Sequence, residues 1–251
     1  AIAIDSYDPA RTLAYFQAYP PQTASGHLRY ALALNASGRR DEANAAVRRA
    51  WTGGTLDEVE TSRALSFFPG ALTLADHDAR MDRLLWSGAT GAASRQLAFV
   101  SPQRRVVFAA RLAMRSNAVD AALQASAVES ADPGLTRSDA GYITDKATWL
   151  RKANRVVEAR ALLAAPRTLT RAPTDAEEWL ETLLTNARAA DSAGDKLTAY
   201  NIARQLSDTF PPGTVVRETP LSVRDDFTSL AWLAGQLAFR DLRRPAEAVQ
   251  L

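Results

Sequence analysis

The sequence predicts an all-α protein, an irregular α-solenoid of stacked, TPR-like helical hairpins with no β-sheet. Apolar residues recur at the three- and four-residue spacing of amphipathic helices, and glycine or asparagine residues interrupt them at short intervals. No segment shows the sustained alternation of apolar and polar residues that a half-buried strand requires. A recurring pattern, a turn residue followed five positions later by alanine, then divides the chain into hairpins.

The clearest hairpin is the stretch from Tyr142 to Pro166. Apolar residues at helical spacing run to Leu150, a Lys-Ala-Asn-Arg segment interrupts them, and the same spacing then resumes. We expect Asn154 to end the first helix in the left-handed conformation, which asparagine tolerates better than most residues. Ala159 is small and is expected where the second helix crosses its neighbour, so that the two backbones can approach closely.

The same pattern recurs along the chain at intervals of 29 to 50 residues between successive alanines. These intervals are too irregular for an array of about 34-residue repeats, but they suit hairpins of variable length. We therefore expect one solenoid domain over residues 1–251, with a long proline-rich loop at about 210–226. The copies are Gly38 with Ala43, Gly88 with Ala93, Asn117 with Ala122, Asn154 with Ala159, Gly194 with Ala199, and a final copy that contains Ala248.

Capping residues mark the expected helix starts. Asp8 precedes Pro9, an N-cap acceptor followed by a proline at the first helical position. Three further starts have a hydroxyl three residues before a carboxylate, which is the spacing of a capping box. These are Thr55 with Glu58, Thr73 with Asp76 and Thr174 with Glu177; weaker starts are Ser101-Pro102 and Ser138-Asp139, and expected stops are Gly38, Gly53, Gly88, Asn117, Asn154 and Gly194.

Composition limits the classes of function. Thirty Lys and Arg against 28 Asp and Glu leave a formal charge of +2, a balance that does not suggest a nucleic-acid or acidic-membrane binder. The chain has no cysteine, and hence no disulfide, thiolate metal site or cysteine nucleophile. No apolar run approaches about 18 residues, so no transmembrane segment is expected. The first ten residues lack the features of a signal peptide, which we expect to be absent or already removed.

The sequence predicts no catalytic, cofactor-binding or metal-binding residue. Asp76, His77 and Asp78, with Asp82 one turn later, have ligand chemistry, but neighbouring helical positions point in different directions. We expect Asp76 and Asp78 to occupy a first helical turn, where carboxylates favour the positive end of the dipole. His27 has no acidic or serine partner in a recognisable arrangement and is expected to be structural or exposed.

Two carboxylate pairs, Glu177 with Glu178 and Asp225 with Asp226, could serve acid–base chemistry, but a raised glutamate pKa needs an apolar pocket. Their polar surroundings favour a structural role. The chain also lacks the usual nucleophile-elbow, zinc-protease and phosphate-loop motifs.

The five tryptophans admit two interpretations. Trp51 and Trp86 each end an expected helix just before a glycine, while Trp149, Trp179 and Trp232 lie inside helical patterns. Packing of one hairpin on the next is favoured for all five, because large aromatic side chains dominate such contacts. The alternative is a surface on which carbohydrate rings stack.

Several segments resemble the superhelical N-terminal region of soluble lytic murein transglycosylases, particularly alphaproteobacterial ones. The most specific marks are the string DHDARMDRLLW and the string WLAGQLAFR near the end of the sequence. The sequence departs from the family at Glu178-Trp179-Leu180-Glu181, where a double tryptophan is more usual. The resembling segments are 38–51, 72–88, 149–166, 177–206 and 227–251.

The resemblance implies a periplasmic protein that acts on peptidoglycan. Lytic transglycosylases cleave the MurNAc–GlcNAc β-1,4 bond to leave 1,6-anhydro ends, using one glutamate in a lysozyme-like domain with an Glu-Ser signature and a Gly-Leu-Met-Gln motif. Neither motif occurs here, so no catalytic residue can be assigned, and a catalytic domain is expected to follow residue 251. The expected partners are glycan strands, that catalytic domain and other cell-wall proteins. The alternative is a TPR-like scaffold for protein–protein interaction.

Overall fold

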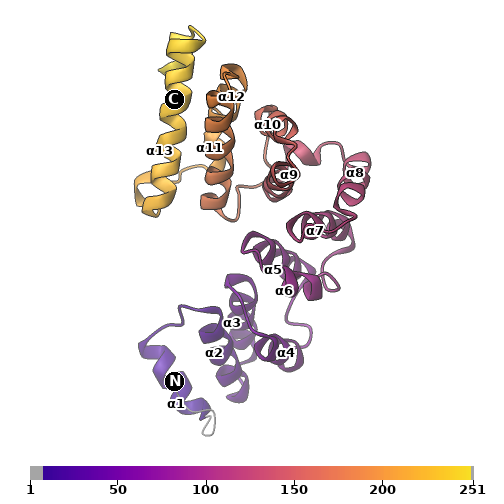
Figure 1. Cartoon of the computed structure of the whole chain (residues 1–251). Helices are drawn as coiled ribbons and strands as arrows, with labels where there is room; N and C mark the ends of the chain where they lie inside the picture. The colour runs from indigo at the N-terminus through magenta and orange to yellow at the C-terminus, as the bar shows by residue number, and fades with distance from the viewer. Residues whose placement is uncertain (1–7, 250–251) are drawn as a thin grey trace. The chain divides into compact units, whose positions relative to one another are not determined.

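The computed structural model describes residues 8–249, and all regular structure within them is helical, with no β-strand (Figure 1). The prediction of an all-α fold is confirmed. Short 3-10 turns lie at Leu135–Arg137, Leu206–Thr209 and Val216–Glu218, and a π turn, η5, lies at Leu237–Asp241. The α-helices are α1 (Pro9–Ala18), α2 (Ala24–Ala36), α3 (Arg40–Gly53), α4 (Glu58–Phe67), α5 (Leu74–Trp86), α6 (Thr90–Gln96), α7 (Pro102–Arg115), α8 (Ala121–Ala131), α9 (Ala140–Lys152), α10 (Val156–Ala164), α11 (Ala176–Ser192), α12 (Lys196–Ala203), α13 (Leu221–Gln236) and α14 (Pro245–Ala248).

The chain divides into two compact units, Ala1–Phe108 and Ala109–Leu251. In the first unit α2 packs on α1, α3 and α4, and α5 packs on α3 and α6. Its core is built around Leu28, Leu34, Val47 and Trp51, all of which are buried. The expectation of a single domain over residues 1–251 stays a prediction.

The second unit stacks its hairpins in the manner of a solenoid. The first helices of successive hairpins pack on one another, α9 on α11 and α11 on α13, and the second helices α10 and α12 do the same. Helix α12 also packs on α13 and on η5, the π turn at the end of α13. Figure 1 shows α11 and α13 running side by side. Each hairpin thus buries the apolar face of its neighbour, which is how short helices obtain a common core.

Every predicted turn residue of the repeating pattern adopts the left-handed conformation, with φ between 52° and 82°. In each case the next residue donates its backbone N–H to the carbonyl four residues before the turn residue, at 2.8 to 3.0 Å. This bond satisfies a carbonyl that the end of the helix would otherwise leave unpaired. The five turn residues are Gly38, Gly88, Asn117, Asn154 and Gly194.

The sixth copy is centred on Arg243, which has a φ of 56° although it is neither glycine nor asparagine. The N–H of Arg244 bonds the carbonyl of Ala238 at 2.7 Å, one residue further back than in the other copies. The extra residue belongs to the π turn that ends α13. The final hairpin therefore has the same left-handed residue between its helices, but the last turn of its first helix is a wider π turn.

The alanine of the repeating pattern is buried in four copies. Ala43, Ala93, Ala159 and Ala199 are each 0% exposed, because a larger side chain there would separate the two helices. The copy after Asn117 differs: Ala122 is exposed and Ala121 is buried instead, at 1%. The second helix of this hairpin starts with an N–H bond from Ala121 to Ala118, which shifts its register by one residue.

Three copies share a further feature that the sequence analysis did not identify. An arginine directly after the turn residue bonds a glutamate three positions later, just before the small alanine of the repeating pattern. The pairs are Arg39 with Glu42 and Arg155 with Glu158, both at 2.6 Å, and Arg244 with Glu247 at 3.7 Å. All three are exposed, so they add little stability individually.

Most of the predicted helix starts are confirmed. Asp8 caps α1, and Thr73 forms a complete capping box with Asp76 at α5. Helix α7 begins at Pro102, and Asp139 caps α9. Two predicted boxes are wrong.

The two boxes fail because an aspartate one or two residues after the expected threonine takes the capping position. Asp57 forms the box of α4 with Glu60, and Asp175 accepts from the N–H of Glu178 at α11. A carboxylate caps at least as well as a threonine hydroxyl. Among the stops, Gly53 ends α3 without a positive φ.

The proline-rich loop is shorter than predicted. It extends from Phe210 to Pro220 and contains one 3-10 turn, because α13 already begins at Leu221. Pro220 is the last proline of this segment, and its φ of −54° suits the residue before a helix. The residues from 221 to 226 are therefore helical.

The Asn154 turn can be tested directly. Replacing Asn154 by alanine should lower the free energy of unfolding by about 1–2 kcal/mol, because a Cβ without a compensating polar side chain disfavours the left-handed conformation. Replacement by glycine should be close to neutral. Urea denaturation of both variants measures the difference, and equal stability of the alanine and glycine variants would contradict the assignment.

Candidate functional site

The acidic and histidine side chains near the start of α5 do not converge. Asp76 closes the capping box with Thr73, at 2.8 Å from the Thr73 N–H. Asp78 lies in the second turn, not the first as predicted, and accepts from both the N–H and the hydroxyl of Ser101, at 2.8 and 2.7 Å. Among residues 8–249 no three His, Asp or Glu side chains are grouped in a way that could hold a metal ion.

His77 is buried between two aromatic rings. The Trp51 ring meets it edge-on and the Phe99 ring stacks on it, each with 5.4 Å between ring centroids. The side-chain amide of Gln96 lies 3.1 Å from Nδ1. Burial lowers the pKa of His77, Arg80 adds to this, and Asp76 and Asp78 oppose it. A neutral ring whose Nδ1 accepts from the amide fits this environment.

Arg80 joins three helices of the first unit. It lies on α5 and is buried, and its guanidinium sits 4.2 Å above the ring of Trp51 on α3. Its nitrogens donate to the Trp51 carbonyl at 3.4 Å and to the Thr61 hydroxyl of α4 at 3.1 Å. Burial lowers the pKa of Arg80 to about 10, which leaves the group charged at neutral pH. The DHDARMDRLLW string is therefore largely a packing motif.

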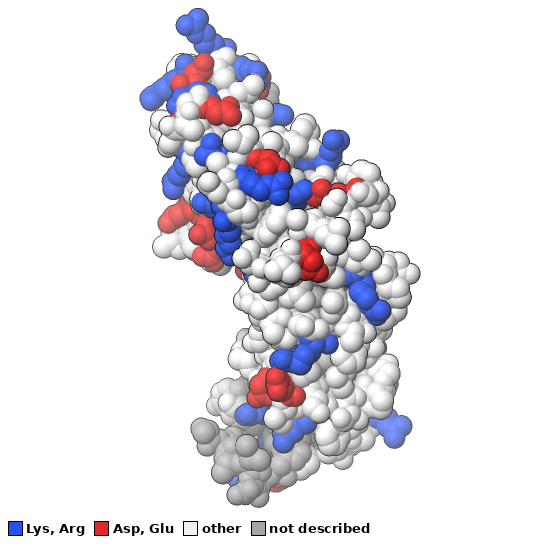
Figure 2. All heavy atoms as spheres, turned by 45° about the vertical axis from the view of Figure 1, so that its right-hand side comes forward, with Lys and Arg blue, Asp and Glu red and all other residues white. Residues whose placement is uncertain are grey.

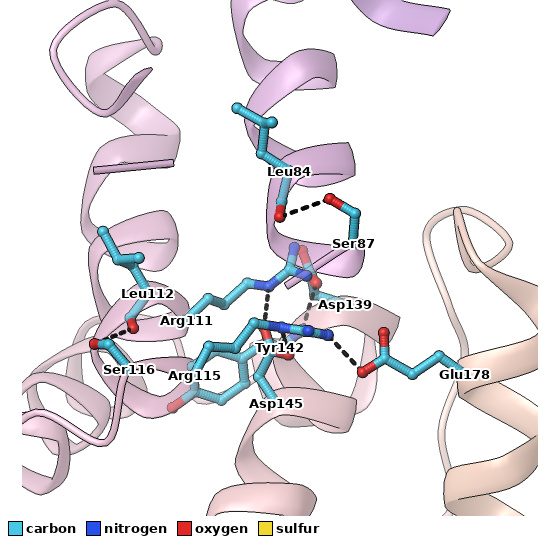
Figure 3. Close-up of polar contacts among 10 residues, drawn as sticks. All are labelled: Leu84, Ser87, Arg111, Leu112, Arg115, Ser116, Asp139, Tyr142, Asp145 and Glu178. Carbon is cyan, nitrogen blue, oxygen red and sulfur yellow. Dashed lines mark hydrogen bonds and ion pairs between the residues drawn. The ribbon is translucent and has the colours of Figure 1, made fainter. Parts of the chain in front are cut away.

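The second unit contains a buried charge cluster, formed by Arg111, Arg115, Asp145 and Glu178 (Figure 3). The Nε atoms of Arg111 and Arg115 on α7 bond the two oxygens of Asp145 on α9, at 2.6 and 2.5 Å. Arg115 Nη2 also bonds Glu178 on α11 at 2.6 Å. Arg111 and Asp145 are essentially inaccessible to water, so the cluster fixes α7, α9 and α11 to one another.

The electrostatics of this cluster depend on the two guanidinium groups. Burial raises the pKa of the Asp145 carboxyl, and the adjacent charges of Arg111 and Arg115 oppose that rise. Burial likewise raises the pKa of Glu178, against the hydrogen bond and charge of Arg115. Removing Arg111 would take away one of the two charges that face Asp145, and removing Arg115 would take a bonded charge from both Asp145 and Glu178.

Gly141 provides the space for this cluster. A Cβ at Gly141 would lie 2.3 Å from Cζ of Arg111, far inside van der Waals contact. Because Arg111 is fully buried and paired with Asp145, its guanidinium cannot move aside without breaking the ion pair. A glycine is thus required at the second residue of α9.

A third cluster joins the second and third hairpins of the second unit. The guanidinium of Arg167 lies 4.8 Å above the ring of Trp179, and its Nε bonds Asp208 at 2.6 Å. The indole N–H of Trp179 donates to the other oxygen of Asp208 at 3.1 Å. Burial raises the pKa of Asp208, with Arg167 opposing the shift. Each unit therefore contains an arginine stacked on a buried tryptophan, Arg80 on Trp51 in the first unit and Arg167 on Trp179 in the second.

The paired carboxylates are not arranged for acid–base catalysis. Glu177 is exposed, whereas Glu178 belongs to the buried cluster. Asp225 is exposed, and the pKa of the partly buried Asp226 is raised by burial against the charge of Arg188. Neither pair shares an apolar pocket, and each member has a different environment.

The tryptophans divide into packed and exposed residues. The packing prediction is confirmed for Trp51, Trp86 and Trp179, which are 0%, 5% and 0% exposed. Trp149 is half-buried beneath the guanidinium of Arg155, 5.5 Å from its ring centroid. The prediction is wrong for Trp232, which is 68% exposed.

Trp232 belongs to an exposed apolar face of α13 and η5, which we call the Trp232 face. It consists of Leu221, Trp232 and Phe239, exposed by 63%, 68% and 63%. Leu221 and Trp232 are eleven residues apart, about three helical turns, and Phe239 follows seven residues later, so all three lie on one side. The opposite side of the helix is buried through Val223, Leu230 and Ala234.

The Trp232 face is the candidate binding site of the described chain. Sequence reasoning missed it because apolar residues at helical spacing occur on both sides of α13, and spacing alone cannot tell which side is covered. The sequence did contain a signal for this face. Helix α13 has a second series of apolar residues at helical spacing, in addition to the series that is buried in the core. Thr228 and Asp225 are exposed on the same side and supply hydrogen-bonding groups.

The molecular surface carries no extended field of one sign on the face drawn in Figure 2, where basic and acidic side chains are interspersed. This agrees with the near balance of charges in the sequence. Within the described residues, no helix is both long and apolar enough to cross a membrane.

Comparisons of the chain with models of protein families, with curated proteins and with solved structures gave no match.

The buried charge cluster gives a stability prediction. Replacing Asp145 by asparagine should lower the free energy of unfolding by about 3–5 kcal/mol, because the buried Arg111 and its neighbour Arg115 would both lose the carboxylate charge that they bond. Urea denaturation followed by circular dichroism measures the loss. The matched control is Asp225→Asn at an exposed position of α13, expected to change stability by less than about 0.5 kcal/mol. Similar losses in both variants would refute a special role for the cluster.

The environment of His77 gives a pH prediction. Its pKa lies below 6.5 in the folded protein and near 6.5 in the unfolded chain. The unfolded chain therefore takes up the proton first, and stability should fall as the pH drops below about 6.5. Glutamine does not titrate, so His77→Gln should lack the fall in stability that protonation of His77 causes. The urea midpoints of this variant at about pH 7 and about pH 5 should therefore differ less than those of the wild type. An unchanged difference would show that His77 is not responsible.

Proposed function

We propose that this chain is the non-catalytic superhelical part of a periplasmic lytic transglycosylase and that it holds glycan strands of peptidoglycan. Two features support the proposal. The resemblance of the segments covers most of the sequence, and the fold is the stack of helical hairpins that such a region requires. The observation that carries the binding role is the exposed Trp232 face.

The chemistry of the Trp232 face suits a sugar chain. A pyranose ring exposes C–H groups on its faces, and these pack against an aromatic ring without losing hydrogen bonds. Trp232 and Phe239 are separated by about two helical turns, so they offer two successive stacking positions. Thr228 and Asp225 lie on the same side and can accept hydrogen bonds from sugar hydroxyls.

In this proposal the chain positions substrate and does not cleave it. Cleavage of the MurNAc–GlcNAc bond belongs to the lysozyme-like domain of the parent enzyme. The buried carboxylates described above are bound by arginines and hold helices together, which leaves them unsuited to protonating a glycosidic oxygen.

The alternative is a TPR-like scaffold that binds a protein partner. The stacking of first helices on first helices and second helices on second helices favours it, because such arrays offer extended surfaces to peptides and helices. Under this alternative the Trp232 face would receive an apolar helix in place of a glycan.

A co-sedimentation assay with purified peptidoglycan separates the two. The wild-type chain should sediment with peptidoglycan, and Trp232→Ala should weaken binding by about tenfold, the usual cost of losing one aromatic stacking contact. Phe67→Ala is the matched control, because Phe67 is an aromatic residue of α4 that is 56% exposed and lies outside the Trp232 face. Absence of binding by the wild type would favour the scaffold. Release of 1,6-anhydro products by the chain alone would contradict the non-catalytic assignment.

A further inference from the structure

The turns of the last three hairpins lie along one edge of the second unit. Helices α9, α11 and α13 pack in succession and α10 packs on α12, so the connections between first and second helices follow one another. We define the turn edge as residues 150–158, 191–198 and 240–247. Neighbouring packed helices are about 8–10 Å apart, so the edge spans about 20 Å.

Most acidic side chains of the turn edge are bound within it. Glu158 accepts two bonds from Arg155, at 2.7 and 2.6 Å, and Asp191 accepts from Lys196 at 2.5 Å. Asp195 caps α12 through the N–H of Thr198 at 3.1 Å. The remaining bound acid, Glu247, accepts from the hydroxyl of Tyr200 at 2.5 Å and faces Arg244.

Four cations remain on the same edge. Arg151 and Lys152 end α9, and Arg240 and Arg243 end the α13–η5 helix; all four are exposed. Over the described range 8–249, none of the four forms an ion pair with an acidic side chain. Asp195 and Asp241 are the acids of the edge that lack a bonded cation within that range. The edge holds seven basic and five acidic side chains, so it is basic by two charges while the rest of the sequence is balanced.

Two exposed apolar side chains belong to the same turn edge. Val157 is 74% exposed and Leu197 is 49% exposed. Each is the third residue after its turn residue, Asn154 or Gly194, so they occupy equivalent positions on the packed helices α10 and α12. Neither position is needed for the hairpin itself, because the buried Ala159 and Ala199 supply the contact.

We propose that the turn edge docks reversibly on an anionic lipid surface. Its four cations would meet negatively charged headgroups, each adding to the attraction, while Val157 and Leu197 would enter the boundary between headgroups and acyl chains. A soluble or cell-wall polyanion would use the cations but would gain nothing from the two apolar side chains. The combination therefore favours a membrane surface. The proposal is independent of glycan binding, since it involves no residue of the Trp232 face.

Vesicle flotation tests the proposal with the full chain. Vesicles of equal parts phosphatidylcholine and phosphatidylglycerol should bind the protein, and vesicles of phosphatidylcholine alone should not. The variant Arg151→Gln, Lys152→Gln, Arg240→Gln should lower the partition coefficient by at least about tenfold. The pair Val157→Ser and Leu197→Ser should lower it severalfold at unchanged charge, and high salt should weaken wild-type binding.

The matched control removes exposed cations outside the turn edge. Arg29→Gln, Arg63→Gln, Arg217→Gln removes the same three charges and should leave vesicle binding unchanged, because Arg29 lies on α2, Arg63 on α4 and Arg217 before α13. Circular dichroism should be the same for all variants. Equal losses in the control, or no effect of the serine substitutions, would overturn the proposal. So would edge-dependent binding to peptidoglycan without binding to anionic vesicles, a result that leaves the test of Trp232 unaffected.

Discussion

The whole structure depends on one backbone constraint, the left-handed residue that ends the first helix of each hairpin. With a positive φ at this residue, the next N–H reaches back to the carbonyl of the last helical turn, and the chain reverses into the second helix. The buried alanine that follows then allows the two helices to pack closely. Because the reversal is local, hairpins of different length can be joined in series, which explains the irregular spacing of the repeats.

Buried arginines determine how successive hairpins fit together. Arg80 on Trp51, Arg167 on Trp179, and the pair Arg111 and Arg115 around Asp145 each connect helices from different hairpins. Apolar contacts alone would tolerate sliding of one hairpin past the next, whereas a buried charge must find its partner in one register. The cost is dehydration of these charges, which the tryptophan faces and carboxylates offset.

The functional proposals use what this framework leaves exposed. In DHDARMDRLLW, one of the motifs that carry the resemblance to lytic transglycosylases, the side chains with described contacts serve packing and capping: His77 and Arg80 lie against Trp51, and Asp76 caps α5. The candidate glycan contact, Trp232, lies in the other motif but on the outer side of its helix. The same chain can therefore combine a rigid interior with an aromatic face and a basic edge that the packing does not use.

The sequence by itself determined the local features of this protein. Helical spacing, capping residues and the turn-plus-alanine pattern depend on neighbours within a few positions, so the all-α class, the five predicted turns and most helix starts could be predicted. The tertiary structure alone decided which side of each helix is covered. Trp179 and Trp232 have similar helical contexts, yet one packs against Arg167 and the other is exposed. The need for Gly141 and the pairing of Asp145 also depend on Arg111, a residue about thirty positions away, and contacts of that range are set by packing.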